Sequence, residues 1–263
     1  MQMLERRDTE PSDPKYRAPA LDRGLDILEV LAGQADGLTR TELMRELGLG
    51  ASQIYRMLER LVARGYVTRL AGGDRYALSM KLFLLATGHP PVRRLTAQAQ
   101  PEMDRFAREM NQSCHLVMPE HGAGIVVAQA SPASHWEFRA RVGASMDLFH
   151  TGSGITLLAF QRPDRIGATM GHWGLHDAAE RLAQRASDLA AIRAAGYRAE
   201  PSRQVVGITD LSVPVLGPSG EAVAAITCAY LERPGHEEAP TRAATLARLI
   251  ALGRTLSLDA APG

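Results

Sequence analysis

Residues 38–78 read LTRTELMRELGLGASQIYRMLERLVARGYVTRLAGGDRYAL, and this stretch decides the fold of the first part of the chain. Two patterns of helical spacing flank a tight turn at 48–50, and two short strand-like runs follow them. Thr39 and Glu42 have the spacing of a capping box, which begins one helix, and Gly48 is placed to end it. Helix, turn, helix and hairpin in this order are typical of a winged helix-turn-helix, a module that places its second helix in the DNA major groove.

The second helix of this module is predicted over residues 51–64 and carries polar side chains on its outward face. Its N-terminal turns are the part that meets base edges, so Ser52, Gln53 and Arg56 are placed where base-reading residues belong. Arg56 can bind guanine through two hydrogen bonds, and Gln53 can bind adenine in the same way. The alternative for Arg56 is a structural ion pair with an acid on a neighbouring helix.

The hairpin after this helix is expected to be the wing. Residues 65–70 and 75–78 read as its strands, and residues 71–74 supply the turn. Arg69 and Arg75 would lie along a phosphate backbone, where they contribute affinity rather than specificity. The predicted DNA-binding residues are Thr39, Arg40, Ser52, Gln53, Tyr55, Arg56, Arg69 and Arg75.

Composition sets the broad class. The 263 residues are 45% hydrophobic, which is enough for a large core and argues against global disorder. The net charge is +1: residues 1–94 carry 15 Lys and Arg against 12 Asp and Glu, and the remainder carries 15 against 17. The charged N-terminus is not a signal peptide, and no apolar run approaches the ~20 residues of a membrane helix. We therefore expect a soluble, cytoplasmic protein with no membrane partner and no cofactor.

The chain is expected to have four segments. Residues 1–18 are polar and read as a disordered arm, and residues 19–79 form the winged helix-turn-helix with a first helix over 20–32. Residues 80–100 read as linker helices, broken by the glycine and prolines at 88–91. An apolar helix between domains often pairs with its copy, and helix-turn-helix proteins usually read two half-sites as dimers, so a homodimer is expected.

The last segment, residues 101–263, alternates strand-like runs with helical patterns. Consecutive strand hairpins with helices between them indicate a mainly antiparallel sheet covered by helices, so the fold class is α+β. Strands are expected over 113–119, 124–130, 136–142, 197–199, 207–216 and 222–231, and helices over 151–160, 165–170, 179–195 and 241–258.

Both parts of the chain resemble the IclR family of bacterial transcriptional regulators. In the first part the resemblance is carried by LDRGLDILEVLA, by the helix-turn-helix stretch and by RYALSMKLFLLA. In the second part it is carried by RVGASMDLFHTGSGITLLAF and by LAAIRAAGYRAEPSRQVVGITDLSVPVLGPSGEAVAAITCAYLER. The resemblance implies that residues 101–263 are a GAF-like effector-binding and oligomerisation domain. It also implies a DNA-binding regulator, dimer or dimer of dimers, whose operator binding responds to a small organic effector, a carboxylate or aromatic acid.

The resemblance places the effector beside the glycine-containing loop that opens the helix at 151–160. Free N–H groups at a helix N-terminus favour a carboxylate. The alternative is that the glycines of this loop, Gly152 and Gly154, only allow close packing. The implied effector-binding residues are Met146, Leu148, Thr151, Gly152, Ser153, Glu200, Asp210, Thr227 and Ala229, with Phe149 beside them.

Two residues depart from the family pattern near this site. Arg203 stands where the family commonly has an acid, and Ile155 stands where lysine is usual. Arg203 is placed either to pair with an effector carboxylate or to lie on the surface. Four further residues can line the same pocket or pack in the core: His115, Met118, His135 and Trp136.

An enzyme and a redox or metal sensor are the rival interpretations. His172 and His176 have the spacing of two ligands on one helical face, but the glycines around them disfavour a helix. Cys114 and His115 are adjacent, so on a strand they point to opposite faces and make a poor nucleophile–base pair. No serine nucleophile elbow, phosphate loop or dinucleotide fingerprint is present. Cys114 and Cys228 are the only cysteines and lie in apolar runs, which favours buried free thiols over a sensor.

Overall fold

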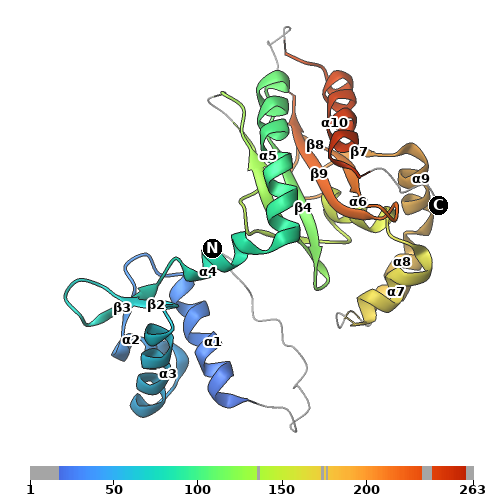
Figure 1. The fold of residues 1–263 in the computed structure, drawn as a ribbon. Coiled ribbons are helices and arrows are strands. Elements are labelled where there is room, and N and C mark those ends of the chain that lie inside the picture. Colours follow the sequence, from blue (N-terminus) through green and yellow to red (C-terminus); the bar gives the residue numbers. More distant parts are fainter. Residues whose placement is uncertain (1–17, 135–136, 173–174, 176, 233–238, 259–263) are drawn as a thin grey trace. The chain divides into compact units, whose positions relative to one another are not determined.

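The computed structural model describes residues 18–134, 137–172, 175, 177–232 and 239–258. The chain divides into two compact units, residues 1–90 and 91–263, which are drawn in Figure 1. Apart from Ala18, the expected N-terminal arm lies outside the described residues. No helix in the described part of the chain is long and apolar enough to cross a membrane.

The first unit is a winged helix-turn-helix, as the sequence predicts. Its core consists of apolar side chains from every one of its helices except the last, together with Val67 and Tyr76 of the wing. Its three strands form an antiparallel sheet in the order β1-β3-β2. The elements are α1 (Pro19–Ala32), β1 (Leu38–Thr39), α2 (Arg40–Leu47), α3 (Ala51–Ala63), β2 (Val67–Arg69), β3 (Arg75–Leu78) and α4 (Lys81–Gly88).

Local signals set the turn between α2 and α3. The Thr39 hydroxyl accepts a hydrogen bond from the Glu42 N–H at 3.2 Å, and the Glu42 carboxylate accepts the Thr39 N–H at 2.8 Å. This reciprocal capping box begins α2. Gly48 ends α2 in the left-handed conformation, with φ of 63°, a region where residues other than glycine are strained. The capping box and the glycine end of α2 are both confirmed.

The second unit is an antiparallel sheet covered by helices, so the α+β prediction is confirmed. Six strands pair in the order β6-β5-β4-β9-β8-β7, and every pairing is antiparallel. The strands are β4 (Cys114–Glu120), β5 (Ala123–Ala130), β6 (Ser145–Asp147), β7 (Arg198–Pro201), β8 (Ile208–Leu216) and β9 (Ala222–Leu231). The helices are α5 (Pro90–Met110), α6 (Gly152–Ala159), α7 (Pro163–His172), α8 (Ala178–Gln184), α9 (Ala186–Ala195) and α10 (Arg242–Leu256).

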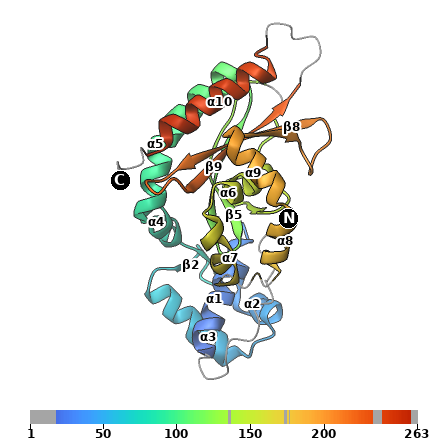
Figure 2. The same cartoon turned by 90° about the vertical axis from the view of Figure 1, so that its right-hand side faces the viewer.

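Helices cover both faces of this sheet. On one face, the α5–α10 face, side chains such as Phe106 and Leu249 pack against the strands in a largely apolar cluster. On the other, the α6 face, Leu157 of α6 and Ile192 of α9 join a second cluster. Figure 2 shows α5 and α10 side by side on their face, with α6 and α9 across the sheet from them. The second unit therefore has two cores separated by one sheet.

Two expected boundaries are corrected by the structure, and one short strand was not expected. Residues 137–142 of the expected strand 136–142 form no strand, and residue 136 lies outside the described part. The sheet edge is formed instead by β6, after a turn at Gly143, whose N–H donates to Val126. The expected helix 179–195 is divided at Arg185, because Asp188 in the first turn of α9 favours a new helix start there. Strand β1 is too short for its pattern to be recognised.

The linker is two helices separated by a single residue. His89 alone separates α4 from α5, so the break expected at 88–91 is this single residue, and Pro90 and Pro91 begin α5. Proline is tolerated in the first turn of a helix because its missing N–H would have no helical partner there. Helix α5 continues past residue 100 to Met110. It therefore crosses the expected boundary between the linker, which ends at residue 100, and the effector-binding domain, which starts at residue 101.

Candidate functional site

The outward face of α3 is exposed and polar. Ile54 and Leu58 are buried in the core, whereas Ser52, Tyr55 and Arg56 are exposed. This alternation follows from helical spacing, since residues three and four apart share a face. The side chains that sequence placed at the base edges are therefore available to a partner.

Arg56 has no part in the ion pairs of the described first unit. Those pairs join Arg45 to Glu46, Arg69 to Glu59 and Arg75 to Glu42. The structural alternative for Arg56, a pair with a neighbouring acid, thus finds no support. Arg40 at the start of α2 places its guanidinium carbon 5.8 Å from the centre of the Tyr55 ring, which brings these two predicted DNA-binding residues together.

Gln53 divides its amide between two tasks. Its Oε1 accepts the Gly50 N–H at 3.4 Å, which helps to begin α3. The amide NH2 group is not used in this contact, so it retains donors for a base acceptor. Half of the bidentate pairing with adenine is thus still possible without breaking the contact to Gly50.

Arg75 is engaged within the first unit. It donates from Nε to the Asp36 carbonyl at 3.0 Å and from Nη2 to the Gly37 carbonyl at 2.8 Å, and it pairs with Glu42 at 3.3 Å. These contacts tie the wing to the turn before α2. The sequence does not reveal this role, because Arg75 is 39 and 38 residues away from the carbonyl groups of Asp36 and Gly37 that it contacts.

Arg69 and Thr39 are engaged as well. Arg69 pairs with Glu59 of α3, and its guanidinium carbon lies 5.6 Å from the centre of the Tyr76 ring. The Thr39 hydroxyl caps α2, and hydrogen bonds from the Thr39 backbone N–H and then from its hydroxyl lower the pKa of Glu42. Contact of these residues with DNA stays a prediction, and their structural roles are now additional to it.

A row of polar side chains crosses the α6 face of the second unit. Strand register places Arg198 of β7 opposite Ser212 of β8, Ser212 opposite Thr227 of β9, and Thr227 opposite His115 of β4. Residues directly opposite one another in a sheet project from the same face. We call these four residues the polar row. All four are buried, although the surrounding core is apolar.

Ser153 of α6 joins the polar row from above. Its hydroxyl lies 2.7 Å from the Thr227 hydroxyl and 3.2 Å from His115 Nε2, and Thr227 lies 2.8 Å from the Ser212 hydroxyl. Burial lowers the pKa of His115 to about 4, so the ring is neutral at pH 7. Ser153 and Thr227, which the family resemblance assigned to the effector, are thus in contact with each other.

The N-terminus of α6 lies against Asp210. Thr151 caps the helix by accepting the Gly154 N–H at 3.0 Å. A Cβ added at Gly152 would lie 2.8 Å from the Asp210 Cβ, and one added at Gly154 would lie 2.4 Å from the Asp147 carbonyl oxygen. The packing role of both glycines is therefore real. Asp210 already places a carboxylate where one was expected from the ligand.

The charge of Asp210 is opposed and supported by different groups. Burial raises its pKa, and Arg198, Ser202 and the Gly152 N–H act in the opposite direction, toward a lower pKa. Arg198 Nη1 lies 3.9 Å from Asp210 Oδ2, and Arg198 Nη2 donates to Glu200 at 2.8 Å. The sequence reading did not single out Arg198, because its burial depends on strand register.

The remaining predicted effector residues lie around this layer. Glu200 and Asp210 are register partners, and Asp210 is in turn opposite Ala229, so all three share the α6 face. Leu148 is buried beside the start of α6, and Met146 lies on β6 and packs against the same core. The structure therefore places Glu200, Asp210 and Ala229 on the face that carries the polar row, and Met146 on β6 at the opposite edge of the sheet from β7.

The departures from the family pattern have different surroundings. Ile155 is buried in the core on the α6 face, and Arg203 is exposed in the loop after β7. Met118 packs against the core of the α5–α10 face, which is the core-packing alternative of the two that the sequence left open. His135 and Trp136 lie outside the described residues.

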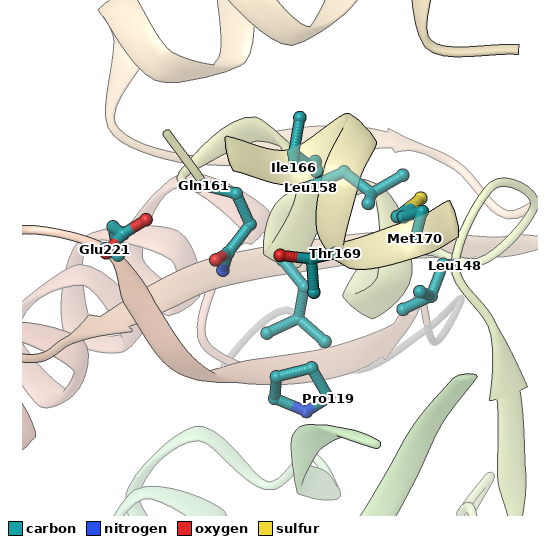
Figure 3. Close-up of a pocket in the computed structure, with 9 residues that line it drawn as sticks. Pro119, Leu148, Leu158, Gln161, Ile166, Thr169, Met170 and Glu221 are labelled. Carbon is teal, nitrogen blue, oxygen red and sulfur yellow. The ribbon is translucent and has the colours of Figure 1, made fainter. Parts of the chain in front are cut away.

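A separate cavity of about 250 Å³ lies toward the other end of α6, beneath α7. It is lined largely by apolar side chains, and Figure 3 shows Leu148 and Met170 on one side and Gln161 and Glu221 on the other. Two of its polar groups are engaged: Gln161 donates to the Ala222 carbonyl at 2.8 Å, and Glu221 accepts the Arg162 N–H at 3.2 Å. The polar row is the better candidate because Arg198 Nη1 within it is buried without a hydrogen-bond partner.

The rival sites find little support. Cys114 and Cys228 are opposite each other on β4 and β9, both are buried free thiols, and burial raises the pKa of each, which disfavours the reactive thiolate. The described residues contain no group of three potential metal ligands. His172 ends α7, and His176 lies outside the described residues, so their pairing is not tested.

Family models match both units. The model of the IclR helix-turn-helix domain matches residues 20–71, and that of the bacterial transcriptional regulator IclR C-terminal domain matches residues 92–258. The chain belongs to the IclR family. It is a transcriptional regulator with a DNA-binding helix-turn-helix.

Relatives and solved structures agree with this assignment. The regulator BhcR of Paracoccus denitrificans is 28% identical over 214 residues, covering 79% of this chain and 76% of the relative. The repressor IclR of Escherichia coli is 23% identical over 215 residues, covering 79% and 78%. These relatives are named as regulators of transcription.

Two solved structures share the fold. HmgR of Pseudomonas aeruginosa has a TM-score of 0.67 at 24% identity and covers 91% of this chain and 98% of its own. An IclR homolog from Microbacterium hydrocarbonoxydans, complexed with 4-hydroxybenzoate, has a TM-score of 0.70 at 23% identity and covers 90% and 97%.

Proposed function

We propose that this IclR-family regulator reads operator DNA through the exposed face of α3, and that a small organic acid bound at the α6 face of the second unit controls that reading. The observation that carries the proposal is the contrast between the two sites. Ser52, Tyr55 and Arg56 are exposed in the first unit. In the second unit the polar row is buried in an otherwise apolar core, and its Arg198 Nη1 has no hydrogen-bond partner, which costs stability.

The DNA-binding proposal divides the contacts into two kinds. Arg56, Gln53 and Ser52 contact base edges and give specificity. Arg40, Tyr55 and the wing residues contact phosphates and give affinity, which falls steeply as salt concentration rises.

A dimer is proposed from an apolar surface on the first unit. Phe83, Leu84 and Leu85 of α4 are 57%, 65% and 54% exposed, and Leu21 and Leu25 of α1 are 61% and 48% exposed. Exposed apolar side chains that gather on a helix mark interaction surfaces. Pairing of two copies through this surface would supply two recognition helices for two half-sites.

The effector proposal rests on the N-terminus of α6 and on the strand residues of the α6 face that lie against it. A helix N-terminus, an arginine and several hydroxyl groups together suit a small acid that also carries a hydrogen-bonding group. The 4-hydroxybenzoate bound by the Microbacterium relative has this chemistry. We infer a carboxylate or aromatic acid as the effector here. We propose that the protein represses transcription, because two relatives are named repressors.

Control follows from linkage. An acid that binds more tightly to one arrangement of the paired DNA-binding units shifts the equilibrium toward that arrangement. By the same linkage, operator DNA changes the affinity for the acid by the same factor.

The experiment is selection of genomic duplexes by the whole protein, followed by fluorescence anisotropy with the selected duplex. Operator affinity is then measured with and without 4-hydroxybenzoate, benzoate and pyruvate. We expect a change of about fivefold or more with at least one acid. Identical operator affinity with every acid would contradict effector control, and failure to select any duplex would contradict specific regulation.

A further inference from the structure

Arg198 is the buried cation of the α6 layer. It is only 2% exposed, and its guanidinium has five N–H donors to satisfy. Nη2 donates to Glu200, whose side chain is about half exposed to solvent. Nη1 is buried and has no hydrogen-bond partner in the described structure. A buried arginine with an unused donor is costly, which calls for a reason why it is kept.

The unused donor faces the N-terminus of α6. Arg198 Nη1 is 3.9 Å from Asp210 Oδ2, too far for a hydrogen bond. Asp210 in turn interacts with the Gly152 N–H at the start of α6. Asp210 therefore lies between two anion-binding groups and satisfies the guanidinium incompletely.

A second unused polar atom lies in the same layer. Apart from Arg198 Nη1, Thr156 Oγ1 is the one buried side-chain nitrogen or oxygen of the described residues without a hydrogen-bond partner. Thr156 is three and four residues beyond Ser153 and Gly152, so it shares their face of α6, toward the sheet. The two unused atoms thus lie on the two sides of one interface.

We propose that Arg198 is the residue that binds the carboxylate of the effector, with Asp210 occupying that position when no effector is bound. This deepens the effector half of the proposed function and rests on it. The class of ligand is a small monocarboxylate, whose two oxygens accept two parallel N–H bonds from the planar guanidinium. Asp210 competes with the ligand for the same donors.

The competition gives the two residues opposite effects. Loss of Arg198 removes the donor to the carboxylate, so the protein binds the acid more weakly. Replacement of Asp210 by asparagine keeps the size of the side chain and removes a negative charge that repels the acid. The protein should therefore bind the acid more tightly. A merely structural Arg198–Asp210 pair would not predict tighter binding from Asp210→Asn.

The experiment is calorimetric titration of the full-length protein with three acids and their uncharged amides: pyruvate, benzoate and 4-hydroxybenzoate, against pyruvamide, benzamide and 4-hydroxybenzamide. We expect at least one acid to bind, and its amide to bind about 10- to 100-fold more weakly, the range of a charged hydrogen bond. Binding by none of the acids, or equal affinity for an acid and its amide, would overturn the proposal.

The variants separate binding from folding. Arg198→Met is expected to lose the preference for the acid over its amide, and Asp210→Asn to raise the affinity for the acid about fivefold or more. Arg198→Lys keeps the charge without the planar fork and should weaken the acid about tenfold; it decides the matter if thermal unfolding shows that Arg198→Met is not folded. Arg193→Met, on α9, is the matched control with unchanged acid affinity.

Unchanged acid affinity in both Arg198 variants, or unchanged or weaker affinity in Asp210→Asn, would contradict the assignment. Operator binding by the wild-type protein is measured in parallel. Intact operator binding without any acid binding would refute the role of Arg198 while leaving DNA recognition standing, whereas loss of both would refute the proposed function itself.

Discussion

The two faces of the six-stranded sheet carry different kinds of side chain. On the α5–α10 face, Phe106, Leu116 and Leu252 belong to a cluster of apolar side chains that are almost all fully buried. On the α6 face, the apolar cluster is interrupted by the polar row and by Ser153 above it. Apolar burial stabilises a fold without further conditions, whereas buried polar groups stabilise it only when every partner is in place. The α5–α10 face therefore stabilises the unit, and the α6 face is the one at which we propose that the effector binds.

The largest effect is expected on the apolar face. Phe106→Ala removes a fully buried ring and leaves a cavity, which costs about 3–5 kcal/mol. Denaturant unfolding followed by circular dichroism measures this loss. Phe138→Ala, at a 40% exposed ring, is the control and should cost much less. Equal losses at the two positions would contradict the role of Phe106 as a fully buried core side chain.

Gly154→Ala tests how closely α6 packs on the turn before it. The new Cβ would lie 2.4 Å from the Asp147 carbonyl oxygen and 2.5 Å from the Leu148 Cα, both backbone atoms that cannot turn aside. We expect a loss of about 2–3 kcal/mol in unfolding free energy. Gly167→Ala on α7, where no atom lies within 4 Å of the added Cβ, is the matched control. A neutral Gly154→Ala would show that α6 is not held against this turn.

Acid should weaken the polar face selectively. His115 has its pKa lowered to about 4 by burial, against about 6.5 in the unfolded chain. A lowered histidine pKa means that the unfolded state binds the proton first, so stability is complete above pH 6.5 and falls as pH drops toward 4. Between pH 7.5 and 5 the loss is about 2 kcal/mol.

The His115→Gln variant isolates this contribution. With no imidazole to titrate, its stability should fall by about 2 kcal/mol less than that of the wild type over the same pH range. Urea unfolding at several pH values gives both curves. Parallel curves would mean that His115 is not buried as a neutral ring.

The smallest stability effect is expected from Thr227→Val. This change keeps the shape but removes the hydroxyl between Ser153 and Ser212, whose contacts to it are 2.7 and 2.8 Å. The expected loss is about 1–2 kcal/mol. Thermal unfolding of Thr227→Val and Thr227→Ser separates the hydroxyl from the methyl group, and a destabilised Thr227→Ser beside an intact Thr227→Val would reverse the assignment.

Sequence predicted the first unit well because its signals are local. The Thr39–Glu42 capping box and Gly48 lie within ten residues and fix the turn between α2 and α3. The apolar spacing of α3 predicted which side chains are outward. The clamp formed by Arg75 was not predictable, because its acceptors, Asp36 and Gly37, are brought to it only by pairing of β1 with β3.

Most of the residues proposed to bind the effector were predicted from the sequence, but the buried arginine among them was not. Ser153, Asp210 and Thr227 were assigned through the family resemblance, and the structure brings them to one face. Arg198 was missed, because an arginine beside a glycine-ended helix resembles any surface residue until register places it opposite Ser212. The expected strand over 136–142 failed for a related reason: residues 145–147 form the sheet edge, and alternation alone does not reveal which of two adjacent runs will pair.

The central claim is specific DNA recognition through α3. It is tested most directly by the affinity of the full-length protein for a selected duplex and for a shuffled duplex of equal length, at about 0.15 M salt. We predict a ratio of about 1,000 or more for the wild type, and a ratio about 10- to 100-fold smaller for Arg56→Ala, with Arg254→Ala on α10 unchanged. Equal affinity of the wild type for both duplexes, or an undiminished ratio in Arg56→Ala, would contradict the account.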